Sequence, residues 1–284
     1  MHERHILTLS CKDARGIVAA VTTFLADNFG FIIESAQFGD ASTGQFFMRV
    51  EFALEQGASD TQALEKKFEV ALAQRFGMQW QMVPKARKSR VLVMVSRYGH
   101  CLNDIIYRYS TAQLPIEIPA IVSNHEDWRH VAQWHDIPFH YLPVDKSALS
   151  HEHALLEIIA REKIDVVVLA RYMQILSPEL CKKLAGKAIN IHHSFLPSFK
   201  GAKPYQQAFD RGVKLIGATA HYVTDALDEG PIIEQEIARV DHAHQPDDLA
   251  AIGHDIECVV LARALKYVSE HRVLLNGQKT VVFR

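Results

Sequence analysis

Residues 164–169 read IDVVVL, a short run that is apolar at every position but one. Similar runs stand before and after it, VLVMV at residues 91–95 and KAINI at residues 187–191, with helical stretches between them. Strands that are apolar throughout are buried on both faces, which is typical of a parallel sheet covered by helices. The three runs therefore predict an α/β fold with a mostly parallel sheet for residues 90–284, and ligands are expected beyond the carboxyl ends of its strands.

The first 84 residues follow a different pattern. Strand and helix periodicities alternate there, and they predict, in order, a strand at 5–10, a helix from Ile17 that stops before Gly30, a strand at 31–38, a hairpin partner around 46–52, a helix at about 61–76 and a strand at about 78–83. This β-α-β-β-α-β order is the ferredoxin-like unit. Residues 85–89 are polar and basic, so the sequence predicts domains at 1–84 and 90–284 with this segment as the linker.

Composition excludes several classes of protein. A chain of 284 residues has about two domains as a prior, and its net charge of −2 gives no general attraction to nucleic acid or to an anionic membrane. No apolar run approaches the roughly 18 residues of a membrane span, and the N-terminus has no signal-peptide core. The expected location is the cytoplasm.

The composition also argues against disulfides and metals. The four cysteines are scattered without a CxxC pair, so neither a disulfide framework nor a zinc ribbon is predicted. The histidine pairs 151/153 and 242/244 have no cysteine or carboxylate partner at a fixed offset, so no metal site is predicted.

The residues that carry chemistry follow the third apolar run. Asn190 and His192 are two apart on a strand, so an amide and an imidazole point to the same face and converge on one point. His193 alternates with them and is expected to face away as a structural residue. Residues 224–231, TDALDEGP, form an acidic loop that ends in a Gly-Pro turn.

These motifs resemble a known family. NIHHSFLP at 190–197, followed by GATAHYVTDALDEGPII at 217–233, is similar to the formyltransferases that use 10-formyltetrahydrofolate, whose fold is a Rossmann-like α/β domain. The resemblance implies a catalytic trio of Asn190, His192 and Asp228.

The residue types of this trio suit formyl chemistry. Attack on a formyl carbon creates an oxyanion, which Asn190 and a protonated His192 can stabilise as donors. A carboxylate at Asp228 can orient or deprotonate an attacking water and favour the charged histidine. The sequence leaves open whether Asp228 takes the water proton itself or acts through His192.

The resemblance also implies a folate-binding wall, because LARYMQILSP at 169–178 is similar to the pterin-binding stretch of the family. The substrate-binding residues expected are Leu169, Tyr172, Met173, Gln174, Ile175, Leu176, His221, Val223, Thr224 and Asp225. Some of them have a plain alternative: residues 172–176 as a helix packed on the sheet, His221 as packing rather than as support for Asp228, and Asp225 as a turn former. Gln174 stands where several relatives have arginine, so the sequence does not say how the glutamate tail of the folate is held.

Water is the nucleophile that the sequence favours. Glycinamide ribonucleotide formyltransferases cradle a phosphate on a short glycine-rich loop after the first strand, whereas residues 96–104 here read SRYGHCLND and carry bulky side chains. This loop, residues 124–127 and 199–202, and the ending at 277–283 resemble formyltetrahydrofolate deformylases. That family hydrolyses 10-formyltetrahydrofolate, as substrate and without a further cofactor, to formate and tetrahydrofolate for one-carbon and purine metabolism. The alternatives are a phosphoribosylglycinamide formyltransferase and a non-catalytic amino-acid or folate sensor.

The front domain resembles an ACT domain, a ferredoxin-like module that often senses amino acids. Its loop CKDARGIV, residues 11–18, opens the first helix, and the resemblance implies an effector site at Asp13, Arg15, Gly16 and Ile17. Relatives commonly have proline where this chain has Lys12 and Arg15, so a module that only pairs subunits is the alternative. Exposed edge strands favour association, and a homo-oligomer is expected.

Overall fold

The computed structural model describes residues 3–57, 60–145, 149–196 and 204–284. The chain forms two compact units: the first unit is residues 1–88 with 270–284, and the second unit is residues 89–269. The predicted boundaries need two corrections. Ser89 is buried and begins a strand of the second unit, so it is not part of a linker. Residues 270–284 belong to the first unit, because they cover one face of its sheet.

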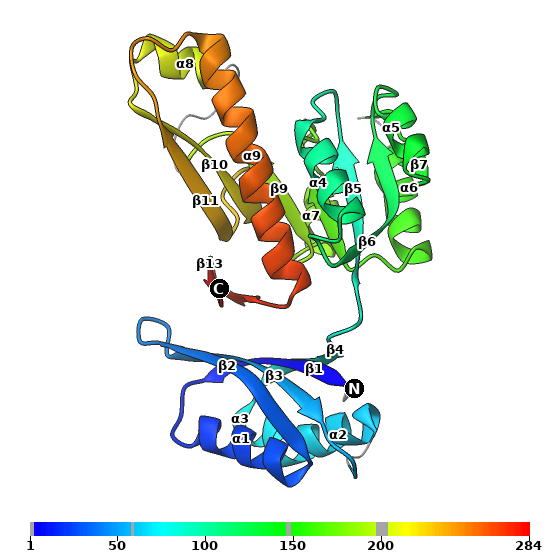
Figure 1. The fold of residues 1–284 in the computed structure, drawn as a ribbon, viewed down its shortest axis with the longest axis vertical. Helices are drawn as coiled ribbons and strands as arrows, with labels where there is room; N and C mark the ends of the chain where they lie inside the picture. Colours follow the sequence, from blue (N-terminus) through cyan, green and yellow to red (C-terminus); the bar gives the residue numbers. More distant parts are fainter. Residues whose placement is uncertain (1–2, 58–59, 146–148, 197–203) are drawn as a thin grey trace. The chain divides into compact units, whose positions relative to one another are not determined.

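The first unit has the element order that the sequence predicts, with a hairpin added from the C-terminus. Its elements are β1 (Arg4–Lys12), α1 (Ile17–Asp27), β2 (Gly30–Asp40), β3 (Gln45–Leu54), α2 (Thr61–Phe68), the π-helical turn η1 (Glu69–Ala73), α3 (Gln74–Phe76), β4 (Gln79–Pro84), β12 (Val273–Asn276) and β13 (Lys279–Val282) (Figure 1). The four-stranded sheet has the order β2-β3-β1-β4, and every neighbouring pair is antiparallel. This is the ferredoxin-like arrangement.

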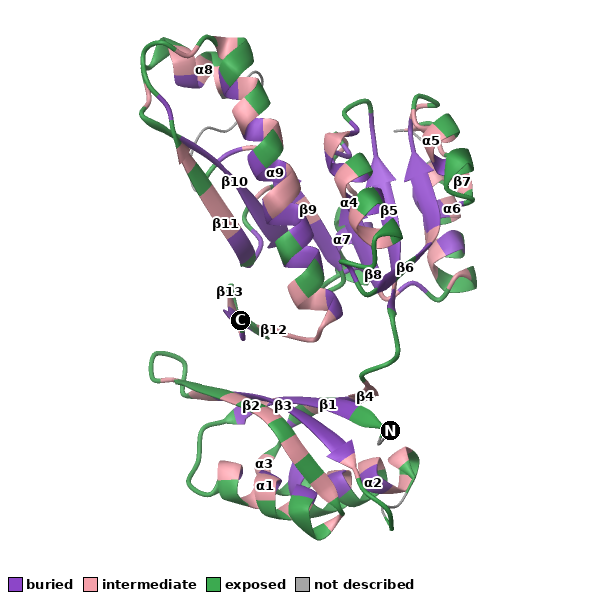
Figure 2. Cartoon of the chain, viewed as in Figure 1, coloured by how far each residue is buried: buried purple, intermediate pink, exposed green. Residues whose placement is uncertain are grey.

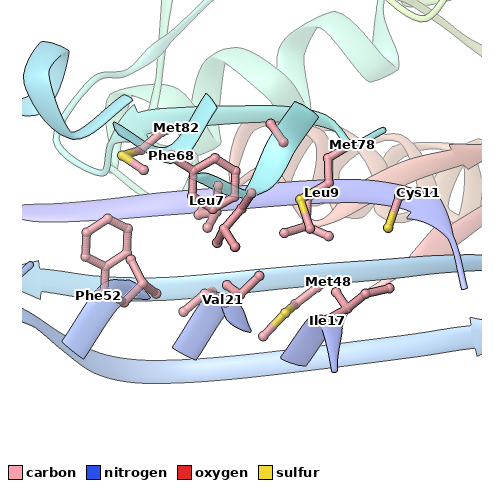
Figure 3. Packing of buried hydrophobic residues seen from close by; sticks show 14 of the residues in the cluster. Leu7, Leu9, Cys11, Ile17, Val21, Met48, Phe52, Phe68, Met78 and Met82 are labelled. Carbon is pink, nitrogen blue, oxygen red and sulfur yellow. The ribbon is translucent and has the colours of Figure 1, made fainter. Parts of the chain in front are cut away.

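Helices cover one face of this sheet. Ile17, Val21 and Leu25 of α1 are buried at a spacing of four residues, which places them along one side of the helix. They pack against alternate residues of the strands, such as Leu7 and Met48 (Figure 3). Burial of this apolar surface is the main favourable contribution to the folding of the unit.

The C-terminal hairpin β12–β13 covers the opposite face. Val281 and Phe283 form an apolar cluster with Phe47 of β3. Beside them the side chain of Arg49, which is 2% exposed, donates to the carbonyl of Glu270 and pairs with Glu34 at 3.2 Å. The strand β3 is therefore buried on both faces, and this explains why the chain's last residues belong with its first.

The second unit is the α/β domain. Its elements are β5 (Ser89–Val95), α4 (His100–Ser110), β6 (Ile116–Ser123), α5 (Arg129–Trp134), β7 (Phe139–Tyr141), α6 (Ser150–Arg161), β8 (Val166–Leu169), α7 (Pro178–Lys183), β9 (Ala188–His192), α8 (Pro204–Asp210), β10 (Leu215–Tyr222), β11 (Ile232–Arg239) and α9 (Pro246–Ser269). The seven-stranded sheet has the order β11-β10-β9-β8-β5-β6-β7, and β5 to β9 are parallel. β10 runs antiparallel to both of its neighbours. The strand order reverses between β5 and β8, which in Rossmann-like sheets is where ligands bind.

Helices lie on both faces of this sheet. Leu155 of α6 and Leu180 of α7 pack against Leu92 and Met94 of β5 on one side, while α4 and α9 pack together on the other. The central strands are buried along their length, as the apolar runs predict (Figure 2). Among the helices of the described ranges, none combines the length and the apolar character that crossing a membrane requires.

The cover that the hairpin provides can be tested with Phe283→Ala. Truncating this buried ring next to Phe47 should lower the free energy of unfolding by about 3 kcal/mol. Urea denaturation measures the change. Leu275→Ala, at a half-exposed position of the same hairpin, is the control and should change stability by no more than about 0.5 kcal/mol. Equal losses in the two variants would show that the hairpin does not cover the sheet.

Candidate active site

The register of β9 against β10 assembles the centre of the site. Asn190 lies opposite His221, and His192 lies opposite Thr219. After β10 the chain turns back through residues 223–231, and Asp228 sits in this loop with a positive φ of 56°. Such a backbone conformation is uncommon for a residue with a side chain, and it occurs often at functional sites.

Two histidines hold the carboxylate of Asp228. The Nδ1 atom of His192 donates to Oδ2 at 3.2 Å, and Nε2 of His221 lies 3.7 Å from Oδ1. Burial raises the pKa of Asp228, but the hydrogen bonds from the two imidazoles outweigh it and hold this pKa well below its usual range. Asp228 is therefore an anion at neutral pH.

The orientation of His221 is fixed by its neighbours. Its Nδ1 donates to the carbonyl oxygen of Tyr222 at 2.8 Å, and its Nε2 lies 3.3 Å from Nδ2 of Asn190. A continuous chain of contacts thus links Asn190, His221, Asp228 and His192. The structure brings together all three residues of the expected catalytic trio.

A cavity of about 280 Å³ opens beside these groups. The thirteen residues that the sequence analysis expects in catalysis and substrate binding all line it: Leu169, Tyr172, Met173, Gln174, Ile175, Leu176, Asn190, His192, His221, Val223, Thr224, Asp225 and Asp228. Five further residues line it that were not expected: Arg171, Cys181, Ile191, His193 and Leu227. Its volume lies near the lower end for small-molecule pockets, which begin at about 300 Å³.

One wall of the cavity is the segment 170–177, between β8 and α7. The alternative interpretation of residues 172–176 as a helix is wrong, because they form an irregular loop. Met173 N–H donates to the Ser96 hydroxyl at 3.1 Å, whereas the N–H groups of Ile175 and Leu176 have no hydrogen-bond partner among the described residues. An irregular loop thus leaves backbone donors for a ligand, which a helix would not.

A buried carboxylate anchors this wall. Glu152 of α6 accepts from the backbone N–H of Ser177 at 2.8 Å and also from its hydroxyl group. The same hydroxyl oxygen caps α7 by accepting from Leu180 N–H at 3.1 Å. Burial, with a smaller effect of the Glu152 charge, raises the pKa of Tyr172 to about 12, so its ring is neutral and lies against the cavity.

On the other side, the loop after β5 is closed by an aromatic ring. Trp128 packs directly on Gly99, where an added Cβ would lie 2.0 Å from the indole. Its Nε1 donates to the carbonyl oxygen of Arg97 at 3.2 Å. Gly99 precedes the N-terminus of α4, which is where a helix would bind a phosphate. The indole occupies the approach to Gly99.

A second buried carboxylate lies behind this loop. Glu257 of α9 accepts from Nε2 of His100 at 2.7 Å and from the hydroxyl of Tyr205 at 2.8 Å, and Nη1 of Arg171 lies 3.5 Å away. Burial raises the pKa of Glu257, yet the hydrogen bond from His100 and the charge of Arg171 bring it below its usual value. We call these four residues the Glu257 cluster.

The position of His193 corrects an expectation. It lines the same cavity as His192, and the two rings stack with centroids 4.7 Å apart. Strand alternation does not apply to it because β9 ends at His192. The sequence therefore misplaces this side chain.

The expected effector residues lie at the start of α1. Gly16 has a φ of 88°, which favours glycine, and it precedes the first residue of the helix. Asp13 and Arg15 are exposed. The side chain of Ile17 is buried in the core, so only its backbone is available at the helix end.

One cluster in the described part of the chain has metal-ligand chemistry, formed by His100, Cys101 and Glu257. Both oxygens of Glu257 are already engaged by the Glu257 cluster, and the Arg171 cation opposes a second positive charge there. The resemblance at residues 199–202 and Pro197 of the motif lie outside the described residues.

Signals for the missed residues exist in the sequence. Arg171 is a charged residue just after a buried strand, which is where ligands of such sheets bind. Glu257 lies within IECVVLA, residues 256–262, where a carboxylate on the apolar side of a helix indicates a buried partner. The sequence does not indicate which residues pair with Glu257.

Known proteins share this architecture. Residues 89–265 match the formyl transferase family. A formyltetrahydrofolate deformylase of Corynebacterium sp. strain P-1 is 49% identical over 99% of this chain and 98% of its own length. The chain belongs to the formyltetrahydrofolate deformylase family. The crystal structure of a member from Burkholderia mallei superposes with a TM-score of 0.95 and 48% identity, covering 99% of this chain and all of that one.

Transferases resemble only part of the chain. The glycinamide ribonucleotide transformylase 1 of Symbiobacterium toebii matches with a TM-score of 0.66 and 26% identity. The match covers 69% of this chain and 95% of that one. The likeness to the deformylase family therefore extends over a larger part of this chain.

Glu152→Ala tests the anchoring of the cavity wall. Without the carboxylate, the Ser177 groups lose their buried partner, so the free energy of unfolding should fall by about 1–3 kcal/mol. Hydrogen exchange at residues 172–177 should accelerate. Glu157→Ala, at an exposed position of the same helix, is the control and should leave both measurements unchanged. Unaltered exchange in Glu152→Ala would mean that the wall is held by other contacts.

Proposed function

We propose that the protein hydrolyses 10-formyltetrahydrofolate to formate and tetrahydrofolate. The observation that carries the proposal is the convergence of Asn190, His192 and Asp228 on one cavity. In addition, the indole of Trp128 covers the loop at Gly99, where a transferase would bind the phosphate of its amine acceptor. Membership of the deformylase family supports the same reaction. The reaction class is acyl transfer to water, on a linear amide C–N bond.

In this proposal the folate lies between the apolar wall of the cavity and the catalytic trio. Its pterin ring lies against the apolar wall of Leu169, Tyr172 and Leu176, and the free N–H groups of Ile175 and Leu176 meet its polar edge. Met173, Gln174, Val223, Thr224 and Asp225 line the same cavity. This orientation directs the formyl group on N10 towards the trio.

The trio stabilises the charge that develops on the formyl oxygen. Asn190 donates from its amide, and a protonated His192 donates from Nε2 while Nδ1 stays on Asp228. Donors that are positioned in advance need no reorganisation as the oxyanion forms, and each contributes about 10²- to 10³-fold in rate. Asp228 balances the charge of His192, and His221 holds that carboxylate in place. Both oxygens of Asp228 face imidazole nitrogens, which favours this orienting role over direct removal of a proton.

Water is the acceptor of the formyl group because the region that would bind an amine substrate, at the start of α4, is covered. Trp128 covers the position where α4 would hold a phosphate. The Glu257 cluster fills the space behind it with a hydrogen-bonded network. In the reaction, a hydroxyl group is added to the formyl carbon and a proton to N10. No metal or further cofactor is required by this scheme, because side chains provide the donors.

We also propose that the first unit is an ACT domain with a regulatory role. Its ferredoxin-like sheet and the glycine that opens α1 support a regulatory site in which backbone N–H groups bind an amino-acid carboxylate. Asp13 and Arg15 flank that position, and the backbone of Gly16 and Ile17 forms it. The edge strands β2 and β4 support assembly into a homo-oligomer.

The decisive assay is formate release from 10-formyltetrahydrofolate with no acceptor added. We expect turnover that glycinamide ribonucleotide does not increase. Activity only in the presence of that ribonucleotide would replace hydrolysis by transfer. Folate binding without turnover would support a sensor.

Asp228→Asn should lower kcat at least a hundredfold, because the neutral amide no longer balances a charged His192. The affinity for tetrahydrofolate, measured by calorimetry, should change little. Asp241→Asn is the matched control, since Asp241 also contacts a histidine, at 2.9 Å, but is exposed and does not line the cavity. A fall of kcat by less than tenfold in Asp228→Asn would contradict the role given to this carboxylate.

A further inference from the structure

We propose that His193 is a further catalytic residue, whose Nε2 binds the attacking water and accepts its proton. The inference rests on the proposed hydrolysis and adds the residue that acts on the nucleophile. It starts from the position of this side chain in the cavity, where strand alternation does not place it.

The geometry sets His193 beside the reacting centre. Its ring lies nearly parallel to that of His192, with an interplanar angle of 24°, and both rings line the cavity. A group bound between Asn190 and His192 is therefore adjacent to His193. No other imidazole in the described residues stacks on His192.

Unsatisfied ring atoms point to a bound polar group. The Nε2 atoms of His192 and of His193 are both buried, and neither has a hydrogen-bond partner among the described residues. Burying a polar atom without a partner costs free energy, so such atoms call for an explanation. The formyl oxygen satisfies the first of them, and a water molecule on the formyl carbon satisfies the second.

The surroundings of His193 favour its neutral form. Burial, the Arg171 cation and the neighbouring His192 lower the pKa of His193 to about 4, although Glu257 and Asp228 act in the opposite direction. A neutral imidazole has an unshared electron pair for a water proton. The stacked rings thus take different roles, one as a donor and the other as an acceptor.

The other bases near the cavity are occupied. The oxygens of Asp228 face His192 and His221, and those of Glu257 accept from His100 and Tyr205. Asp225 lies exposed in the loop after β10. Among the described residues that line the cavity, His192 and His193 each have a buried Nε2 without a partner, and because Nε2 of His192 is assigned to the formyl oxygen, that of His193 is left for the water.

The chemical step balances with water as the only co-reactant. The water oxygen bonds to the formyl carbon, the carbonyl π pair moves to the formyl oxygen, and one water proton passes to Nε2 of His193. On collapse the carbonyl bond re-forms, the bond to N10 breaks, and N10 takes the proton from His193. The products are tetrahydrofolate and formic acid, which ionises in solvent, and His193 is neutral again.

Three variants test the role of Nε2. The substitution His193→Gln places an amide near the position of Nε2, whereas His193→Asn and His193→Leu leave no polar atom there. We expect the leucine and asparagine variants to lower kcat for formate release at least a hundredfold. The glutamine amide can hydrogen-bond a water molecule but cannot accept its proton, so this variant should also lower kcat at least a hundredfold, with tetrahydrofolate affinity unchanged in all three. His153→Leu, at an exposed position of α6 outside the cavity, is the control for loss of a histidine.

Hydroxylamine separates water activation from a structural role. It attacks a formyl group without prior loss of a proton, so formohydroxamate production should fall much less than formate release in His193→Asn. Equal falls of both products, or a kcat within fivefold of the wild type in His193→Leu or His193→Gln, would overturn the proposal. Should the leucine variant not fold, the polar glutamine and asparagine variants decide. Absence of formate release by the wild type would instead refute the proposed function.

Discussion

The pairing of β9 with β10 is the constraint on which the site depends. Because Asn190 lies opposite His221, the amide, the imidazole and the loop that follows β10 all reach the same edge of the sheet. A slip of one residue in this register would turn every side chain of the strand to the other face. Asn190 and His192 would then point away from the cavity together, and Asp228 would lose both of its imidazole partners. The backbone hydrogen bonds of one strand pair thus fix the position of the chemistry.

The site has two buried carboxylates, and the residues that pair with each of them give the two carboxylates different roles. Asp228 is held by two histidines at the reacting end, and Glu257 by His100, Tyr205 and Arg171 on the acceptor side. A buried charge is tolerable when it is paired and hydrogen-bonded. The first pairing places a donor against the substrate, whereas the second turns a region that could admit an amine into part of the protein interior.

The sequence predicted the structure well wherever burial leaves a pattern within a single strand or helix. The apolar runs of β5, β8 and β9, and the alternation of the first unit, report burial directly, so the fold could be predicted from them. The thirteen cavity residues were expected because the motifs resemble those of a known family. The failures involve contacts between distant segments. Nothing near residues 270–284 indicates that they cover β3, and Glu257 meets His100 across 157 positions. His193 was misplaced because strand alternation was extended one residue beyond the end of the strand.

The packing of Trp128 on Gly99 has an evolutionary consequence. The two residues are mutually dependent, since any side chain at 99 collides with the indole, and a smaller residue at 128 leaves the space of the indole unfilled. Opening the region fully also requires dismantling the Arg171–Glu257 contact, which draws on two further segments. A substitution at either position alone therefore disturbs the packing of the other. Changes at positions 99 and 128 are coupled, and evolution of this loop has to alter both together.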